Sequence, residues 1–233
     1  LDTPVVQRIY ALAERCVKAL GPDVPIGVPD VQSPFDIAAL VWNKEDMFIA
    51  MVEEPEAVHR LVAKCDRLLR LFFKEYRRVV PNLNFAHCPY CWAPESMGIW
   101  LSEDEAGAIS TDMFEELCLP SLMALSRDFG GINLHCCADA DHQYAHLLKL
   151  PGFRAFNRCF TRDPKVSVDT FHGRTTLVVA WHSVAQIDRL LSMAQPDTRY
   201  LFSVYPMQLD EAKGIMDHFS GQLSIPAAAC AMA

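Results

Sequence analysis

Short apolar runs alternate with longer stretches of helical periodicity along most of the chain. The clearest helix is predicted over Pro55 to Val79, where apolar side chains from Val58 to Tyr76 recur every three or four residues. Basic side chains lie between these apolar positions, and we interpret them as a solvated face. An earlier helix is predicted between Pro4, which follows a capping threonine, and Gly21, which is a helix stop.

The rest of the pattern predicts further strands and helices in alternation. Strands are expected at 24–28, 83–86, 98–101, 132–135, 153–157, 175–180 and 200–204. Helices are expected at 35–42, 47–52, 110–129, 143–149, 184–194 and 209–219. Such alternation predicts a parallel sheet with helices outside it. No Gly-x-Gly-x-x-Gly turn follows a strand, which disfavours a dinucleotide-binding sheet, so we favour an α/β fold of the TIM (β/α)₈-barrel type.

Composition narrows the class of protein. The chain has 233 residues, of which 51% are hydrophobic and 21% charged, as expected for a single globular domain over 1–233. No apolar run approaches membrane-spanning length and no secretory signal opens the chain, so we expect a cytoplasmic protein with no membrane partner. The net charge of −8 disfavours a nucleic-acid partner. Nine cysteines, an odd number, indicate reduced thiols, some of which could bind metal.

The strongest candidate chemistry closes the strand that begins at Ile132. His135 and Cys137 are two residues apart, so their side chains should point to one face while Cys136 points away. An imidazole and a thiolate so placed suit Zn²⁺. A third ligand would come from another strand end, and the candidate cysteines are Cys88, Cys91, Cys159 and Cys230. The alternative is a buried histidine beside small, apolar cysteines.

Other polar residues also fall at the expected strand ends. Asp104, in the cluster Ser102–Glu105, is a candidate general acid or base or metal ligand; the alternative is that this cluster is solvated near a helix N-terminus. His87 is a second catalytic candidate. The candidate substrate-binding residues are Asp30, Arg158 and His182. Cys88 and Cys91 have the spacing of a redox dithiol, but they lie in mid-chain after a long helix, so we interpret them as loop thiols or metal-site contributors.

Four segments together resemble the uroporphyrinogen decarboxylase superfamily: Ser33–Ala39, Glu54–His59, Leu101–Ser110 and Phe114–Pro120. The similarity extends from about Asp2 to Phe219. It implies a (β/α)₈ barrel with a pocket at the carboxyl ends of the strands, and a homodimer, as is common among the decarboxylases. It also implies that the chain begins near the third strand of the barrel, without the first two βα units.

The two branches of this superfamily imply different functions. His135 and Cys137 fall where the cobamide-dependent methyltransferases carry His-x-Cys-Gly, with Ala138 in place of the glycine. That match implies a zinc ion held by His135, Cys137 and Cys230, which activates a thiol substrate, and a corrinoid protein as the methyl-donor partner. Val204–Pro206 stand where the decarboxylases carry Gly-His-Gly. The alternatives are a tetrapyrrole (uroporphyrinogen) decarboxylase and a non-catalytic barrel that binds a small molecule.

Overall fold

The computed structural model describes residues 1–158, 163–180, 183–205 and 208–220. Its helices are α1 (Pro4–Leu20), α2 (Pro34–Val41), α3 (Lys44–Glu53), α4 (Pro55–Val79), α5 (Thr111–Leu117), α6 (Leu119–Phe129), α7 (Tyr144–Leu147), α8 (Pro164–Phe171), α9 (Val184–Ser192) and α10 (Leu209–Phe219). Its strands are β1 (Ile26–Gly27), β2 (Leu83–Asn84), β3 (Ile99–Ser102), β4 (Ile132–Cys136), β5 (Phe153–Arg158), β6 (Thr176–Ala180) and β7 (Tyr200–Ser203).

The strands are parallel and follow one another in chain order. Strands β3 to β7 form one five-stranded sheet, and β1 pairs with β2 separately. A parallel bridge joins Gln32 to Ser102 at the end of β3, so the segment after β1 lies along the edge of the larger sheet. Sequential parallel order is the connectivity of a (β/α)-barrel. The predicted parallel α/β architecture is therefore confirmed, but the described residues form an open sheet and not a closed barrel.

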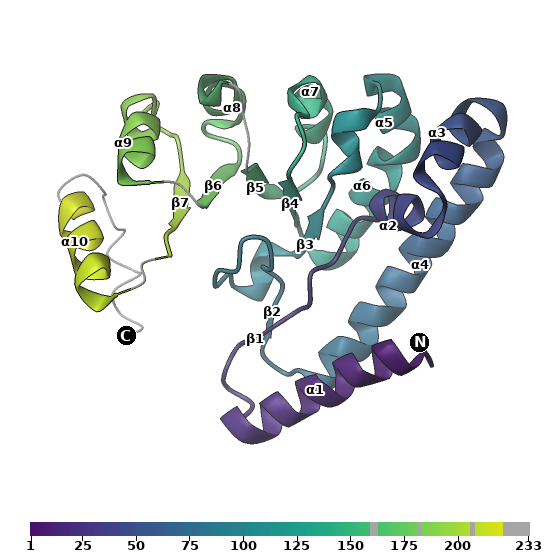
Figure 1. Cartoon of the computed structure of the whole chain (residues 1–233), viewed down its shortest axis with the longest axis horizontal. Coiled ribbons are helices and arrows are strands. Elements are labelled where there is room, and N and C mark those ends of the chain that lie inside the picture. Colours follow the sequence, from purple (N-terminus) through teal and green to yellow (C-terminus); the bar gives the residue numbers. More distant parts are fainter. Residues whose placement is uncertain (159–162, 181–182, 206–207, 221–233) are drawn as a thin grey trace.

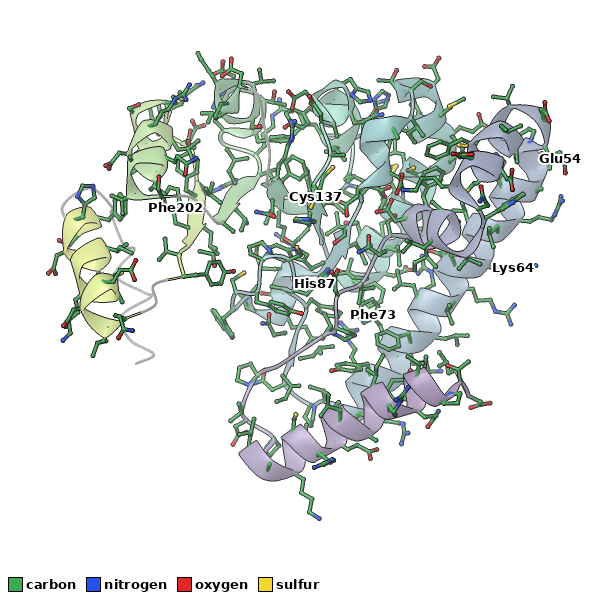
Figure 2. All side chains as sticks on the ribbon, viewed as in Figure 1. Glu54, Lys64, Phe73, His87, Cys137 and Phe202 are labelled. Carbon is green, nitrogen blue, oxygen red and sulfur yellow. The ribbon has the colours of Figure 1, made fainter. Side chains whose placement is uncertain are left out.

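Helices cover the outer side of the sheet, and the longest helix braces the N-terminal part. Figure 1 shows α7, α8 and α9 following one another along the same side of the strands. Helix α4 contacts α1, α2 and α3. Inside this region Phe73 of α4 packs its ring against those of Phe85 and Phe129, which ties α4 to the segment after β2 and to the end of α6 (Figure 2).

Two predicted helical features differ from the structure. The expected single helix over 110–129 is two helices in the structure. Helix α5 ends at Leu117 and α6 begins at Leu119, after the cap residue Cys118, because Pro120 lies in the first turn of α6. Helix α8 was not predicted: it has eight residues, capped by Asp163, and its apolar stripe is too short to stand out. Within the described residues, no helix is both long enough and apolar enough to cross a membrane.

One close backbone approach requires glycine. Gly98 has φ of +85° just before β3, and a Cβ atom there would lie 2.1 Å from the carbonyl oxygen of Gly131. The same carbonyl accepts a hydrogen bond from the N–H of Ile99 at 3.1 Å. Gly98 therefore lets β3 begin directly beside β4, and this sets where the two strands end at the opposite edge.

Candidate metal centre

The carboxyl ends of β3 and β4 bring three possible metal ligands together. Asp104 lies two residues after β3, His135 lies in β4, and Cys137 follows β4 directly. One ligand atom from each lies within 4.8 Å of the others. His135 Nε2 is 2.8 Å from Cys137 Sγ and 3.9 Å from Asp104 Oδ1. His135 is buried, whereas Cys137 is exposed at the surface of the cluster (Figure 2).

Strand geometry selects which cysteine joins this cluster. His135 and Cys137 face the same side, as their spacing predicts. Cys136 is buried, and its Sγ lies 3.6 Å from the carbonyl oxygen of Ala138. Burial raises the pKa of the Cys136 thiol, so it stays protonated and inert. The sequence-based prediction that Cys136 points away is confirmed.

Asn157 fixes the proton on His135. Its Nδ2 donates to the carbonyl oxygen of Val178 at 2.6 Å, so its Oδ1 faces Nδ1 of His135, 2.5 Å away. An amide oxygen can only accept, so Nδ1 must carry a hydrogen. Nε2 of the neutral ring then presents its lone pair to Cys137 and Asp104. This is the tautomer that binds a metal through Nε2, and a partner on the other ring nitrogen is a regular feature of metal-ligating histidines.

Asp104 is held in place from two directions. Its Oδ1 accepts a hydrogen bond from the backbone N–H of Cys137 at 2.5 Å. Its own backbone N–H donates to Asp36 Oδ2 at 2.6 Å, and the N–H of Glu105 donates to Asp36 Oδ1 at 3.1 Å. Asp36 is a buried residue of α2, so a helix 68 positions earlier in the chain fixes the turn that carries Asp104.

A second acidic side chain is buried under this turn. Burial, above all, raises the pKa of Asp36 to about 7, although the two backbone N–H groups oppose that shift. Glu103 is 2% exposed, and burial followed by the charge of Asp36 raises its pKa as well. Ser33 and Asp36 lie close to Glu103, but neither of its carboxylate oxygens makes a well-formed hydrogen bond. The alternative that the Ser102–Glu105 cluster is solvated is therefore wrong for Glu103.

Asp30 and His87 form a second pair at the same edge. His87 Nε2 lies 3.3 Å from Asp30 Oδ1, and His87 Nδ1 is 3.1 Å from the carbonyl oxygen of Phe85. The His87 contact is the main reason why the pKa of Asp30 is lowered; the Ser102 hydroxyl, 3.5 Å from Asp30 Oδ1, acts in the same direction. His87 is buried, whereas the Asp30 side chain is 58% exposed. Two predicted site residues thus lie together beside β3.

The loop cysteines do not join the ligand cluster. Burial raises the pKa of Cys88 to about 12, and the charges of Asp30, Cys137 and Asp104 add to that shift, which places Cys88 near the cluster. Burial also raises the pKa of Cys91. A thiol with a raised pKa is a poor redox nucleophile, which supports the interpretation of the pair as loop thiols.

Of the remaining predicted site residues, Arg158 is the one that lies within the described part of the chain. Arg158 ends β5 with its side chain 3% exposed; it forms ion pairs with Asp139, at 2.8 Å, and with Asp141. A substrate-binding role for Arg158 stays a prediction, but its charge is already balanced. His182, Cys159 and Cys230 lie outside the described residues, so the predicted third ligand Cys230 has no described position. Asp104 occupies the third place in the described cluster.

Sequence reasoning missed the two residues that organise the cluster, Asn157 and Asp36. Asn157 pairs in register with His135 across β4 and β5. Asp36 sits in the first turn of α2, where an acidic residue is ordinary and carries no signal of its own. Strand register could have identified Asn157; Asp36 required the three-dimensional packing of α2 on the end of β3.

The donor set fits zinc better than harder cations. Nitrogen, sulfur and carboxylate oxygen are the ligands Zn²⁺ takes in proteins, whereas Mg²⁺ and Ca²⁺ prefer oxygen alone. Three protein ligands with one exposed side are also the pattern of a zinc site that keeps a position open for substrate. The cluster is therefore compatible with a zinc ion whose coordination is open on one side.

Comparison with known proteins gives a likeness in structure. No family model and no curated protein matches the sequence. Among solved structures, a methyltransferase from Methanosarcina mazei superposes with a TM-score of 0.65 at 15% sequence identity. The match covers 93% of this chain and 64% of that chain, so this chain spans less than two thirds of its structural neighbour. At this identity the likeness shows that the two share a fold.

Proposed function

We propose that this chain forms the zinc-binding part of a methyltransferase that transfers a methyl group from a corrinoid carrier to a thiol. The observation that carries the proposal is the cluster of Asp104, His135 and Cys137, in which Asn157 leaves the His135 Nε2 lone pair directed at the other two ligands. The fold shared with a methyltransferase supports the same class of reaction. A zinc ion bound here would act as a Lewis acid and stabilise a substrate thiol as its thiolate.

The chain's own residues supply binding and proton transfer in this proposal. In the proposed reaction the thiol would lose its proton and its sulfur would take the methyl group from the corrinoid carrier, whose cobalt would keep both electrons of the broken methyl–cobalt bond. His87, together with the exposed Asp30, is the proposed acceptor of the thiol proton: Nδ1 can donate to Phe85 O, and the proton would be taken up at the contact between Nε2 and Asp30. Asp30, next to Nε2, would stabilise the imidazolium that results.

The first test is metal content. Purified protein should contain near-stoichiometric zinc, the His135→Ala/Cys137→Ala variant should contain none, and Cys91→Ser should match the wild type as a thiol control. Replacing zinc with Co²⁺ should give thiolate-to-cobalt absorption in the wild type and in Cys91→Ser only. Wild-type protein that contains no zinc and also fails to bind Co²⁺ would contradict the zinc proposal. Methylation of a thiol by methylcobalamin, dependent on His87, then tests the reaction itself.

A metal-free thiol nucleophile is the second candidate, and one observation favours it. Cys137 Sγ, His135 and Asn157 Oδ1 stand in the order nucleophile, base and orienting amide, with separations of 2.8 and 2.5 Å. The backbone N–H of Cys137, which could stabilise an oxyanion, is instead bonded to Asp104. Rapid alkylation of Cys137 in protein that binds no metal would favour this candidate. A decarboxylase or a simple binding barrel would show neither metal nor a reactive thiol.

A further inference from the structure

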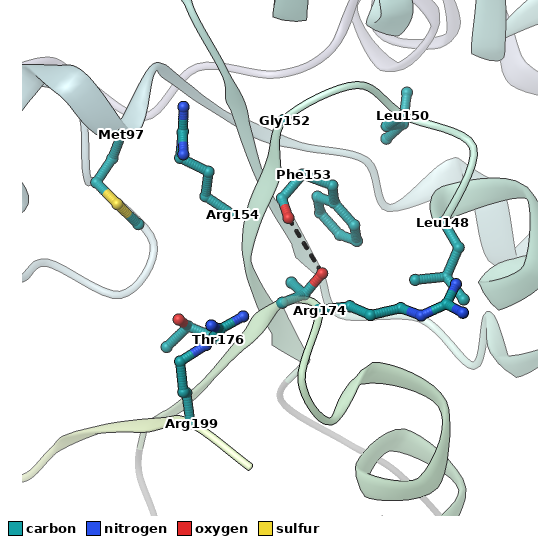
Figure 3. A pocket seen from close by; sticks show the side chains of 10 residues that line it. Met97, Leu148, Leu150, Gly152, Phe153, Arg154, Arg174, Thr176 and Arg199 are labelled. Carbon is teal, nitrogen blue, oxygen red and sulfur yellow. Dashed lines mark hydrogen bonds between the residues drawn. The ribbon is translucent and has the colours of Figure 1, made fainter. Parts of the chain in front are cut away.

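A pocket of about 500 Å³ opens at the amino-terminal ends of the strands, whereas the metal centre lies at their carboxyl-terminal ends. It lies where β5, β6 and β7 begin: Phe153 and Thr176 are the first residues of β5 and β6, and Arg199 precedes β7. Three arginines line it, Arg154, Arg174 and Arg199 (Figure 3). Its volume is in the range typical of small-molecule sites.

The three arginines lack carboxylate partners. Among the described residues, no Asp or Glu oxygen lies within ion-pair distance of their guanidinium groups. Arg154 donates to the neutral carbonyl of Gly130 at 3.1 Å. The carboxylate of Asp197 contacts His172 Nδ1 at 3.1 Å, and this contact is the main reason why the pKa of Asp197 is lowered; the charge of Arg199 is a smaller contribution in the same direction.

This local excess of positive charge stands out in a chain of net charge −8. Like charges around one pocket repel one another, and a bound anion relieves that repulsion. Guanidinium groups bind phosphate and carboxylate through paired, charge-assisted hydrogen bonds. Arg70 and Arg158, by contrast, form ion pairs with aspartate side chains, so their charges are already neutralised within the protein.

The arrangement of the side chains indicates a ligand with more than one charge. In Figure 3, Arg154, Arg199 and Thr176 lie on one side of the start of β5, while Arg174 lies on the other side. The Thr175 hydroxyl is already used, because it donates to the carbonyl of Phe153 at 3.1 Å. A single small anion would meet only part of this set, whereas a ligand with two separated anionic groups can contact both sides.

We propose that this pocket binds a small polyanion, a molecule that carries two or more phosphate or carboxylate groups. The zinc cluster lies at the carboxyl ends of β3 and β4 and the pocket at the amino ends of β5 to β7, so the proposal does not depend on the methyl-transfer function. It is a binding site only, and no reaction is assigned to it.

Isothermal titration calorimetry with inorganic pyrophosphate and with citrate tests the proposal on the full chain. We expect at least one probe to bind at low ionic strength and to bind more weakly at higher salt. The Arg174→Gln/Arg199→Gln variant should lose affinity by about tenfold or more, because it removes two charge-assisted contacts to the bound anion. Tighter binding of pyrophosphate would assign phosphate as the recognised group, and tighter binding of citrate would assign carboxylate.

The matched control is Arg67→Gln, which removes an exposed arginine of α4 that does not line the pocket. It should bind both probes as the wild type does, and circular dichroism should show that all variants are folded. The proposal is overturned if neither probe binds the wild type, or if Arg67→Gln weakens binding as much as the pocket variant does.

Discussion

At the scale of single residues, the candidate centre depends on a side chain that cannot itself bind the metal. Asn157 is fully buried and bonded on both sides, to Val178 O and to His135 Nδ1. Because its amide is held from one side, its oxygen dictates the tautomer of His135 on the other. The position of the histidine lone pair is thus set before any ligand arrives, which lowers the reorganisation needed to bind one.

Replacing Asn157 should therefore weaken metal binding without touching a ligand. We expect Asn157→Ala to lower zinc affinity by about 10- to 100-fold, the usual effect of losing such a partner. Asn157→Asp keeps an acceptor for His135 Nδ1 and should bind zinc more tightly than Asn157→Ala. Titration against a chromophoric chelator measures both affinities.

The control for this substitution is another buried strand asparagine. Asn133 of β4 is also fully buried and donates to the carbonyls of Met97 and Ile99. Asn133→Ala should destabilise the protein but leave zinc affinity near that of the wild type. Equal losses of affinity in the Asn133 and Asn157 variants would show that general destabilisation, not orientation of His135, is responsible.

The sequence was sufficient for part of this centre. A spacing of two on a strand is enough to place His135 and Cys137 on one face, whatever the rest of the fold does. Asp104 could be marked as a strand-end acid, but its meeting with His135 depends on β3 and β4 being neighbours. Asn157 depends on the register between β4 and β5, and long-range register leaves no trace in a local pattern.

At the scale of elements, α2 controls the turn after β3 through a buried carboxylate. Asp36 accepts the N–H groups of Asp104 and Glu105, so two consecutive backbone donors in the turn after β3 share one carboxylate of α2. Local patterns predicted most of the elements, since caps and apolar spacing are local. They missed the division of 110–129 at Cys118 and the helix α8, and they could not indicate that α2 would bury an acid.

Burial of Asp36 should make the protein less stable as pH rises. Its pKa is about 7 in the folded state against 3.8 ordinarily, so between these values the folded state holds more protons than the unfolded state. Stability from this group is complete below pH 4, falls as pH rises toward 7 and is then constant, with each pKa unit worth about 1.4 kcal/mol. Asp36→Asn should flatten this fall; Glu103, shifted in the same direction, leaves a residual slope.

Urea unfolding of chelator-treated protein at pH 5 and pH 8 measures this difference. The exposed Asp112 of α5 provides the control, and Asp112→Asn should keep the wild-type pH dependence. If Asp36→Asn loses as much stability between the two pH values as the wild type, Asp36 does not hold its proton in the folded state.

At the scale of the whole molecule, parallel strands in chain order separate two kinds of chemistry. Nitrogen, sulfur and carboxylate ligands gather at the carboxyl ends of β3 and β4, and uncompensated guanidinium groups line the pocket at the amino ends of β5 to β7. The alternation of strands and helices predicted the parallel sheet, because that signal repeats along the chain. Closure of a barrel is a property of the whole strand set, and the pattern of individual elements could not decide it.

Metal binding at the carboxyl edge should stabilise the whole fold, because Asp104 and the pair His135 and Cys137 come from adjacent strands and meet only in the folded state. Zinc at 100 times its dissociation constant adds about 2.7 kcal/mol. For a chain of this size that corresponds to a rise in melting temperature of roughly 5–10 °C. Calorimetric melting with zinc and with chelator should show this rise in the wild type and its absence in His135→Ala/Cys137→Ala. Mg²⁺ should give no rise, since it prefers oxygen ligands; an equal zinc effect in the double variant would place the bound metal elsewhere on the protein.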